Sequence, residues 1–163
     1  MGGRRIEKGR KAETNFKKWL DKHDIPYLYI KQNPESFSKA FKNQFKGKRP
    51  DFIILIPNFG FIFVEIKHKD LNLKYKSYPI DCRETKKYSS FQRKFNMQIW
   101  YAVSNERMDY KTWLWIPTSK VMELGIKKKV SSKSGEGFFP IPPQEFIQLS
   151  QNDSLERLFS QLF

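Results

Sequence analysis

The sequence has little cysteine and no long apolar run, and these two absences exclude several classes of protein. The single cysteine, Cys82, excludes an intrachain disulfide and favours a reducing compartment. The longest apolar stretch, 52–64, is interrupted by proline, asparagine and glycine, so it is too short to span a bilayer. Residues 1–24 are charged throughout and lack the apolar segment of a signal peptide. We therefore expect a cytoplasmic protein with no membrane partner.

Acidic residues are also scarce. The chain of 163 residues has 17 Asp and Glu against 31 Lys and Arg, which gives a formal net charge of +14. Such an excess is typical of proteins that bind nucleic acid. An anionic membrane surface is the alternative, but the basic residues are spread along the chain and do not gather on one amphipathic helix. The charge therefore predicts a nucleic acid as the partner.

The length predicts a single folded domain over residues 1–163, because 39% of the residues are hydrophobic and 16% are aromatic. No internal repeat is visible. Two segments stand apart by composition: a basic insertion at 31–49, and a stretch at 127–144 rich in Lys, Ser, Gly and Pro, which we expect to be mobile.

Hydrophobic periodicity indicates an alternation of helices and strands. We expect helices at 7–23, 84–99 and 118–126, a last helix that begins at Asp153 or Ser154, and strands at 25–30, 52–56, 61–67, 99–103 and 112–116. The strand at 61–67 is apolar except for two residues, which is typical of a strand covered on both faces. The fold class is therefore α/β, with a central mixed β-sheet flanked by helices.

Three charged residues lie within or beside the most apolar strands. Glu65 and Lys67 are two residues apart on one strand, so both point to the same face, and Asp51 immediately precedes the neighbouring strand. A tight hairpin brings the two carboxylates close together, where they repel each other unless a divalent cation lies between them. Oxygen ligands with room left for water and a phosphate favour Mg²⁺. The three residues therefore predict a hydrolytic metal site.

The register of this hairpin decides whether the prediction holds. With a four-residue loop at 57–60 and strict pairing, Asp51 would lie opposite Ile66 and point to the wrong face. We therefore expect an odd-length turn, a bulge, or a bend at Pro50 that brings Asp51 to the face of Glu65.

The segments "RPD" (49–51) and "EIK" (65–67), with thirteen residues between Asp51 and Glu65, resemble the PD-(D/E)xK nuclease superfamily. The resemblance implies a restriction-endonuclease-like α-β-β-β-α-β core. It also implies that Asp51, Glu65 and the carbonyl of Ile66 bind Mg²⁺, with Mn²⁺ able to replace it, and that Lys67 positions or deprotonates the attacking water.

Further segments are similar to those of Holliday-junction resolvases. "GRKAE" (9–13) resembles the first helix of archaeal resolvases, which implies a catalytic role for Glu13. "SYPI" (77–80) followed by Gln92 resembles the bacterial RecU type, which implies a catalytic role for Gln92. The resemblance thus favours a Mg²⁺-dependent DNA endonuclease that resolves junctions, and a two-fold substrate favours a homodimer.

Two alternatives remain for the function: a sequence-specific endonuclease of restriction or homing type, and a DNA-binding protein that uses the same scaffold without catalysis. For DNA contacts we expect basic residues of the insertion and of the helix after the second charged strand: Lys46, Lys48, Arg49, Lys86, Lys87 and Arg93. Those on the helix are equally compatible with an ordinary solvated face.

Overall fold

The computed structural model describes residues 2–45, 48–126, 128–131, 133 and 137–160. Its centre is a six-stranded sheet in the order β1-β2-β3-β5-β6-β9, in which β3 and β5 are parallel and every other neighbouring pair is antiparallel. The strands are β1 (Tyr27–Tyr29), β2 (Phe52–Ile56), β3 (Gly60–His68), β5 (Ile99–Ser104), β6 (Trp113–Pro117) and β9 (Ile147–Leu149). The predicted fold, an α/β domain with a central mixed sheet, is confirmed, and β3 is an inner strand as expected.

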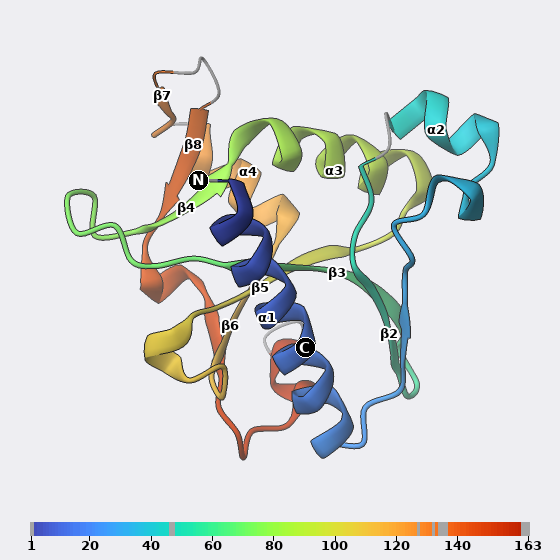
Figure 1. The fold of residues 1–163 in the computed structure, drawn as a ribbon, viewed down its shortest axis with the longest axis horizontal. Coiled ribbons are helices and arrows are strands. Elements are labelled where there is room, and N and C mark those ends of the chain that lie inside the picture. The colour runs from blue at the N-terminus through green and yellow to red at the C-terminus, as the bar shows by residue number, and fades with distance from the viewer. Residues whose placement is uncertain (1, 46–47, 127, 132, 134–136, 161–163) are drawn as a thin grey trace.

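Helices cover both faces of this sheet (Figure 1). Helix α1 (Gly2–Lys22) packs on one face, where Ala12, Phe16, Trp19 and Leu20 form its buried stripe. Helices α3 (Cys82–Phe95) and α4 (Thr118–Gly125) cover the other face. A short helix, α2 (Lys39–Phe45), lies within the basic insertion. The apolar run of β3 thus follows from burial on two sides.

Strand β6 contributes side chains to the hydrophobic cores on both faces of the sheet. Trp113 and Trp115 are fully buried on the side of α1, while Leu114 and Ile116 are buried on the side of α3 and α4. Successive side chains of a strand point to opposite faces, so this strand between two helical layers buries the side chains on both of its faces and is apolar at every position.

A second sheet was not predicted. Strand β4 (Tyr78–Asp81) pairs with β8 (Gly137–Ile141), and β8 pairs with β7 (Val130–Ser131). Within the stretch at 127–144, residues 137–141 form a regular strand, and Phe139 and Ile141 are buried against α3 and α4. A Cβ at Gly125 would come within 2.3 Å of the Phe139 ring, so α4 approaches β8 closely only because this residue is glycine. Residues 127, 132 and 134–136 lie outside the described residues.

The ends of three predicted elements also differ. Helix α3 begins at Cys82 because the Asp81 side chain accepts a hydrogen bond from the backbone N–H of Glu84 and caps the helix. The last predicted helix is a short 3-10 turn, η4 (Leu155–Leu158), which Ser154 caps. Strand β1 covers only Tyr27–Tyr29. Among the described residues, no helix is both long and apolar enough to cross a membrane.

Candidate active site

The hairpin of β2 and β3 has the odd-length turn that the site requires. Three residues, Pro57, Asn58 and Phe59, connect the strands, and the register pairs Ile56 with Gly60 and Phe52 with Val64. Gly60 has φ 121°, a backbone conformation that favours glycine. The pairing ends at Phe52 and Val64, and Asp51 lies immediately beyond it, where it contacts Val64 and Ile66 of β3, so the expected odd-length turn is confirmed.

Asp51 is buried at the end of β2. Its backbone N–H donates to the carbonyl of Val64 at 3.1 Å, and its carboxylate Oδ2 accepts a hydrogen bond from the backbone N–H of Ile66 at 2.8 Å. Burial and the charge of Glu65 raise the pKa of Asp51 to about 8, although the hydrogen bond from Ile66 acts in the opposite direction. Two carboxylates are therefore held close together at a position where ionising both is unfavourable.

Glu65, which is 4% exposed, lies among groups that donate to both of its oxygens. The hydroxyl of Tyr88 on α3 donates to Oε2 at 2.7 Å. The ammonium of Lys67 lies 3.0 Å from Oε1, and that of Lys48 lies 3.4 Å from the same atom. These contacts fix the orientation of the carboxylate and place the predicted Glu65–Lys67 pair on the face covered by α3.

Lys67 also contacts a carboxylate that the sequence analysis missed. Its Nζ lies 2.8 Å from Oε1 of Glu84, in the first turn of α3. Burial lowers the pKa of Lys67, but Glu65 and Glu84 together outweigh this effect and raise the pKa above its ordinary value. In this state Lys67 is therefore a firmly protonated hydrogen-bond donor, and it is positioned to hold a water molecule or phosphate oxygen more readily than to take up a proton.

Glu84 is a buried member of the site, and Lys48 is its second partner. Lys48 lies 2.6 Å from Oε2 of Glu84. Burial raises the pKa of Glu84, but the two lysines outweigh it and hold the pKa below its usual value. We refer to Asp51, Glu65, Lys67, Glu84 and Lys48 as the acid–lysine cluster.

The sequence contains one pattern that involves Glu84, although it indicates a helix cap and not a site residue. Asp81 and Glu84 have the spacing of a capping box, in which the glutamate reaches back to the first turn of its own helix. Here Glu84 instead points to β3, and only the position of that strand reveals its role.

Glu13 lies beside the cluster and not within it. It is partly buried on α1 and accepts a hydrogen bond from the hydroxyl of Tyr29 at 3.1 Å. Its charge raises the pKa of Asp51, although less than burial and Glu65 do. The structure therefore brings Glu13 close enough to Asp51 for its charge to act on that carboxyl group.

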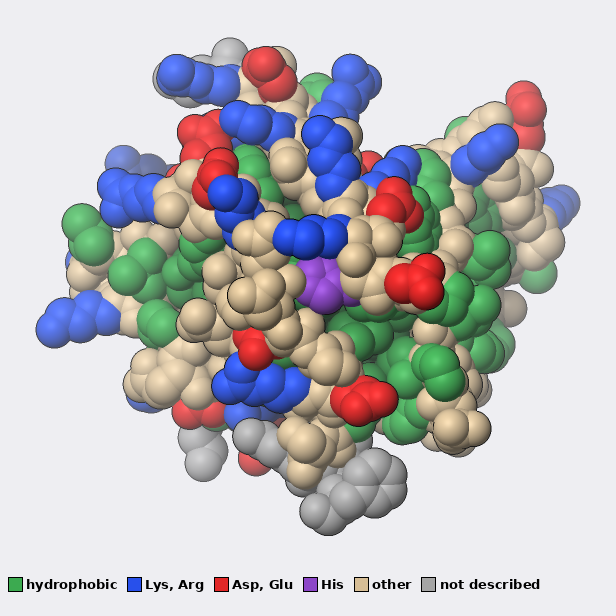
Figure 2. Space-filling model, turned by 90° about the horizontal axis from the view of Figure 1, so that it is seen from below, with side chains coloured by type: hydrophobic (Ala, Val, Ile, Leu, Met, Phe, Trp, Pro, Cys, Tyr) green, Lys and Arg blue, Asp and Glu red, His purple; other side chains and the backbone are tan. Residues whose placement is uncertain are grey.

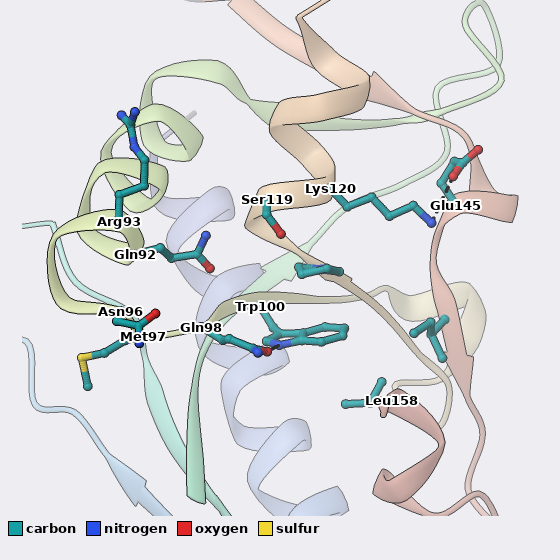
Figure 3. A pocket seen from close by; sticks show the side chains of 12 residues that line it. Gln92, Arg93, Asn96, Met97, Gln98, Trp100, Ser119, Lys120, Glu145 and Leu158 are labelled. Carbon is teal, nitrogen blue, oxygen red and sulfur yellow. Dashed lines mark hydrogen bonds and ion pairs between the residues drawn. The ribbon is translucent and has the colours of Figure 1, made fainter. Parts of the chain in front are cut away.

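Gln92 does not join the cluster. It lies two helical turns beyond Glu84 on α3, and its side-chain Oε1 accepts a hydrogen bond from the backbone N–H of Ile99 at 2.7 Å. It lines a separate pocket at that end of the helix (Figure 3). The structure thus gives Gln92 a contact with the first residue of β5 and not with the carboxylates.

The residues expected to contact DNA fall into different environments. Arg49 is 7% exposed, because its guanidinium stacks on Phe37 at 3.8 Å and donates to Gln32. The prediction placed this side chain at the surface, whereas the structure buries it. Lys48 belongs to the acid–lysine cluster. Lys46 lies outside the described residues. The remaining predicted contacts are on α3, with Lys86 and Arg93 exposed and Lys87 partly buried. Lys and Arg side chains are distributed over much of the face shown in Figure 2.

The carboxylates present suit Mg²⁺, which needs few protein ligands, better than a metal ion whose ligands are all protein side chains. Among the described residues, no three His, Cys, Asp or Glu side chains converge as a complete ligand set. Mg²⁺ is commonly bound by one or two carboxylates, with water and substrate phosphate as the other ligands. Asp51 and Glu65 provide such a pair, and burial together with the charge of Glu65 raises the pKa of Asp51.

No protein-family model matches the sequence, and no curated protein matches it either. Among solved structures, D212, a nuclease from a fusselovirus, aligns over 97% of this chain and 89% of that chain, with a TM-score of 0.50 and 14% identity. Hjc of Archaeoglobus fulgidus, a Holliday junction resolvase from an archaeal hyperthermophile, aligns over 81% of this chain and 88% of that chain, with a TM-score of 0.48 and 14% identity. The predicted resemblance is therefore found at the level of the fold, which this chain shares with the viral nuclease.

Proposed function

We propose that this protein is a Mg²⁺-dependent DNA endonuclease that hydrolyses phosphodiester bonds at the acid–lysine cluster. The observation that carries the proposal is the hydrogen bond from the Ile66 N–H to the Asp51 carboxylate, next to Glu65, whose own carboxylate lies 3.0 Å from the Lys67 ammonium. Two carboxylates and a lysine at one end of a hairpin are the groups that metal-assisted phosphodiester hydrolysis requires. The fold shared with a viral nuclease and the charge of +14 support the same proposal.

In this proposal, Asp51 and Glu65 bind the ion. The carbonyl of Ile66 is a further ligand, because the N–H and C=O of one strand residue point to the same side, and this N–H contacts Asp51. When bound, the ion polarises the phosphate and lowers the pKa of a nearby water. Mn²⁺, which also prefers oxygen ligands, is expected to replace Mg²⁺.

The other members of the cluster position the reacting groups. Lys67 donates to the attacking water or to a phosphate oxygen, and Glu84 holds its ammonium in place. Tyr88 fixes the orientation of Glu65. Lys48 is available to a second phosphate oxygen once a cation replaces it beside Glu65. Glu13 is placed to accept hydrogen bonds from water around the ion.

We propose a four-way DNA junction as the substrate, which rests on the resolvase-like segments at 9–13 and 77–80. The test incubates the protein with a four-way junction, a linear duplex and a single strand, each with Mg²⁺ or with EDTA. Symmetric nicks in the junction alone support the proposal, and a fixed cut in the duplex supports a sequence-specific endonuclease instead.

Asp51→Asn is the decisive variant in this assay, because it keeps the shape of the side chain but removes its charge. It is expected to bind DNA but not to cut it. Asp109→Asn, on an exposed aspartate that pairs with Lys111, is the matched control and is expected to cut normally. Absence of cutting by the wild type on all three substrates would instead favour a DNA-binding protein without catalysis.

We also propose that the active species is a homodimer, because a two-fold substrate is cut on both strands by two sites. An apolar surface is available for the contact. Leu28, Leu55 and Phe61 are 57%, 39% and 46% exposed and lie on one face of β1, β2 and β3. In the view of Figure 2, hydrophobic side chains also reach the surface on the side where β2 and β3 lie. Sedimentation velocity should show a dimer that Phe61→Lys converts to a monomer; a wild-type monomer at tens of micromolar would contradict it.

A further inference from the structure

Lys69 follows the last residue of β3 and lies on the same face as Lys67, because residues two apart on an extended chain point to one side. The pairing with β5 continues to this residue, since the backbone N–H of Lys69 donates to the carbonyl of Ser104 at 3.2 Å. The carbonyl of Lys69 accepts a hydrogen bond from the side-chain amide of Asn105 at 3.0 Å, and Asn105 is itself buried. Both peptide groups of Lys69 are therefore fixed, which holds the base of its side chain in a defined position beside the acid–lysine cluster.

The ammonium of Lys69 differs from the other lysines of this region in having no carboxylate partner. Lys67 and Lys48 each contact both Glu65 and Glu84. Lys69 is partly buried, yet among the residues that the structure describes its side chain forms no ion pair and no hydrogen bond. Burial and the positive charge of Lys67 lower the pKa of Lys69, although Glu84 acts in the opposite direction. Burying a cation without a counter-ion is unfavourable, so neither packing nor an ion pair of the fold explains this side chain.

The surroundings of Lys69 suit a phosphate group. The positive charge of Arg5, an exposed residue near the start of α1, also acts on Lys69, so two cations lie on this side of the cluster. Lysine ammonium groups bind phosphate oxygens through charge-assisted hydrogen bonds. Residues two apart on a strand are separated by about 6.6 Å, which is comparable to the spacing of neighbouring phosphates along a nucleic acid strand. A strand whose cleaved phosphate lies at Lys67 therefore presents its next phosphate to Lys69.

We propose that Lys69 binds the phosphate next to the one that is cleaved and thereby fixes the register of the DNA strand in the active site. This inference rests on the proposed nuclease function, and it goes beyond that function by assigning one phosphate of the substrate to one residue. Lys69 contacts the substrate away from the reacting atoms, so its loss weakens binding. Because its charge is compensated only by the substrate, the same side chain lowers the stability of the free protein.

Lys69→Met tests both consequences. Methionine retains much of the side-chain volume but carries no charge. In EDTA, fluorescence anisotropy should show a DNA affinity about fivefold lower than that of the wild type, and a slope of log K against log salt that is smaller by about 1. Lys69→Arg should retain most of the affinity. Lys111→Met, on an exposed lysine that pairs with Asp109, is the control and should bind as the wild type does.

The stability of the same variants separates a binding role from a structural one. Without DNA, the midpoint of thermal unfolding of Lys69→Met should be higher than that of the wild type by roughly 2 °C or more, because the unpaired buried charge is gone. A lower midpoint would show that Lys69 supports the fold and would overturn the proposal. An unchanged DNA affinity in Lys69→Met would overturn it as well.

Single methylphosphonates in a four-way junction identify the phosphate, because each one removes the charge of one phosphate. Mg²⁺ and the wild type locate the cut, and binding is measured in EDTA. Neutralising the phosphate next to the cut should weaken binding by the wild type but have little further effect on Lys69→Met. Coupling to a distant phosphate, or to none, would contradict the proposal. If the wild type bound the junction without cutting it, the nuclease function would fail, whereas coupling of Lys69 to one phosphate would still support the contact.

Discussion

Glu84 and Lys67 form a partly buried ion pair, with Oε1 and Nζ 2.8 Å apart, that connects the first turn of α3 to the inner strand β3. The pair explains how a lysine is kept charged beside the carboxylate of Glu65 in a largely buried place. Helix α3 therefore does more than pack against the sheet, because it carries both Glu84 and the Tyr88 hydroxyl that contacts Glu65.

Glu84→Gln should lower kcat for DNA cleavage by about 10- to 100-fold, since groups that orient the residues of a metal site have effects of this size. The amide removes one of the two carboxylates that Lys67 and Lys48 share, and only Glu65 remains of this pair, so the positions of the lysines relax while KM changes little. Steady-state kinetics measure the two constants separately, and Glu84→Asp should restore part of kcat. Glu123→Gln on an exposed position of α4 is the control. An unchanged kcat in Glu84→Gln would show that the ion pair only supports the fold.

Lys67→Met should abolish cleavage while it leaves DNA affinity within about twofold of the wild type, because methionine retains much of the buried volume but cannot donate a hydrogen bond. Gel-based cleavage and fluorescence anisotropy with the same labelled substrate separate the two properties. Lys111→Met, on an exposed lysine, serves as the control. Cleavage by Lys67→Met at the wild-type rate would exclude Lys67 from the reaction.

Stability without metal should fall as the pH rises from about 4 to about 8. The pKa of Asp51 is raised from 3.8 to about 8 in the folded protein, so the folded state holds a proton in this range that the unfolded state has lost. A folded state that binds more protons is stabilised at low pH, and this contribution is lost as the pH approaches 8. Thermal unfolding in EDTA between pH 5 and 9 measures the trend.

Two comparisons isolate Asp51 in that experiment. Asp51→Asn should remove most of the decline, because the amide does not ionise. Mg²⁺ should stabilise the wild type more at pH 8 than at pH 6, since the ion competes with the proton for the same carboxylate. If the stability of the wild type declined with pH at the same slope as that of Asp51→Asn, the decline would not come from Asp51. This result would argue against repulsion between the charges of Asp51 and Glu65.

DNA affinity should decrease steeply with salt, with a linear dependence of log K on log salt concentration. Lys86 is exposed on α3, close to the first turn that carries Glu84, so Lys86→Gln should reduce the slope by about 1 if it contacts a phosphate. Anisotropy titrations at several salt concentrations in EDTA provide the slopes, with Lys111→Gln as the control. An affinity of the wild type that does not change with salt would contradict the electrostatic part of the proposal.

The sequence predicted the parts of the site that depend on local pattern. The alternation of Glu65 and Lys67 on one strand and the odd-length turn that aligns Asp51 both follow from strand geometry, and the structure has both. Glu84 was missed because its partner is 17 residues away and in another element. Arg49 was misplaced because its charge is compatible with a solvent position, while the stacking on Phe37 depends on the path of the insertion.

The same distinction applies to the fold. The elements that the sequence predicts around the central sheet have strong helical or apolar patterns, whereas β4 and β8 are short and contain proline at Pro79 and Pro140. Proline is typical of loops and edge strands, so a segment rich in Pro, Gly and Ser predicts an irregular region. Burial of Phe139 beside Gly125 overrides that tendency, and a pairing between residues so far apart in sequence is not visible in a local pattern.

The most direct test is a crystal structure of the protein soaked in Mn²⁺, with anomalous scattering used to locate the ion. We expect one peak within about 2.0 to 2.3 Å of carboxylate oxygens of both Asp51 and Glu65, with the ammonium of Lys67 nearby. If DNA cleavage requires the metal, a peak elsewhere, or none at these two carboxylates, would contradict the proposed site.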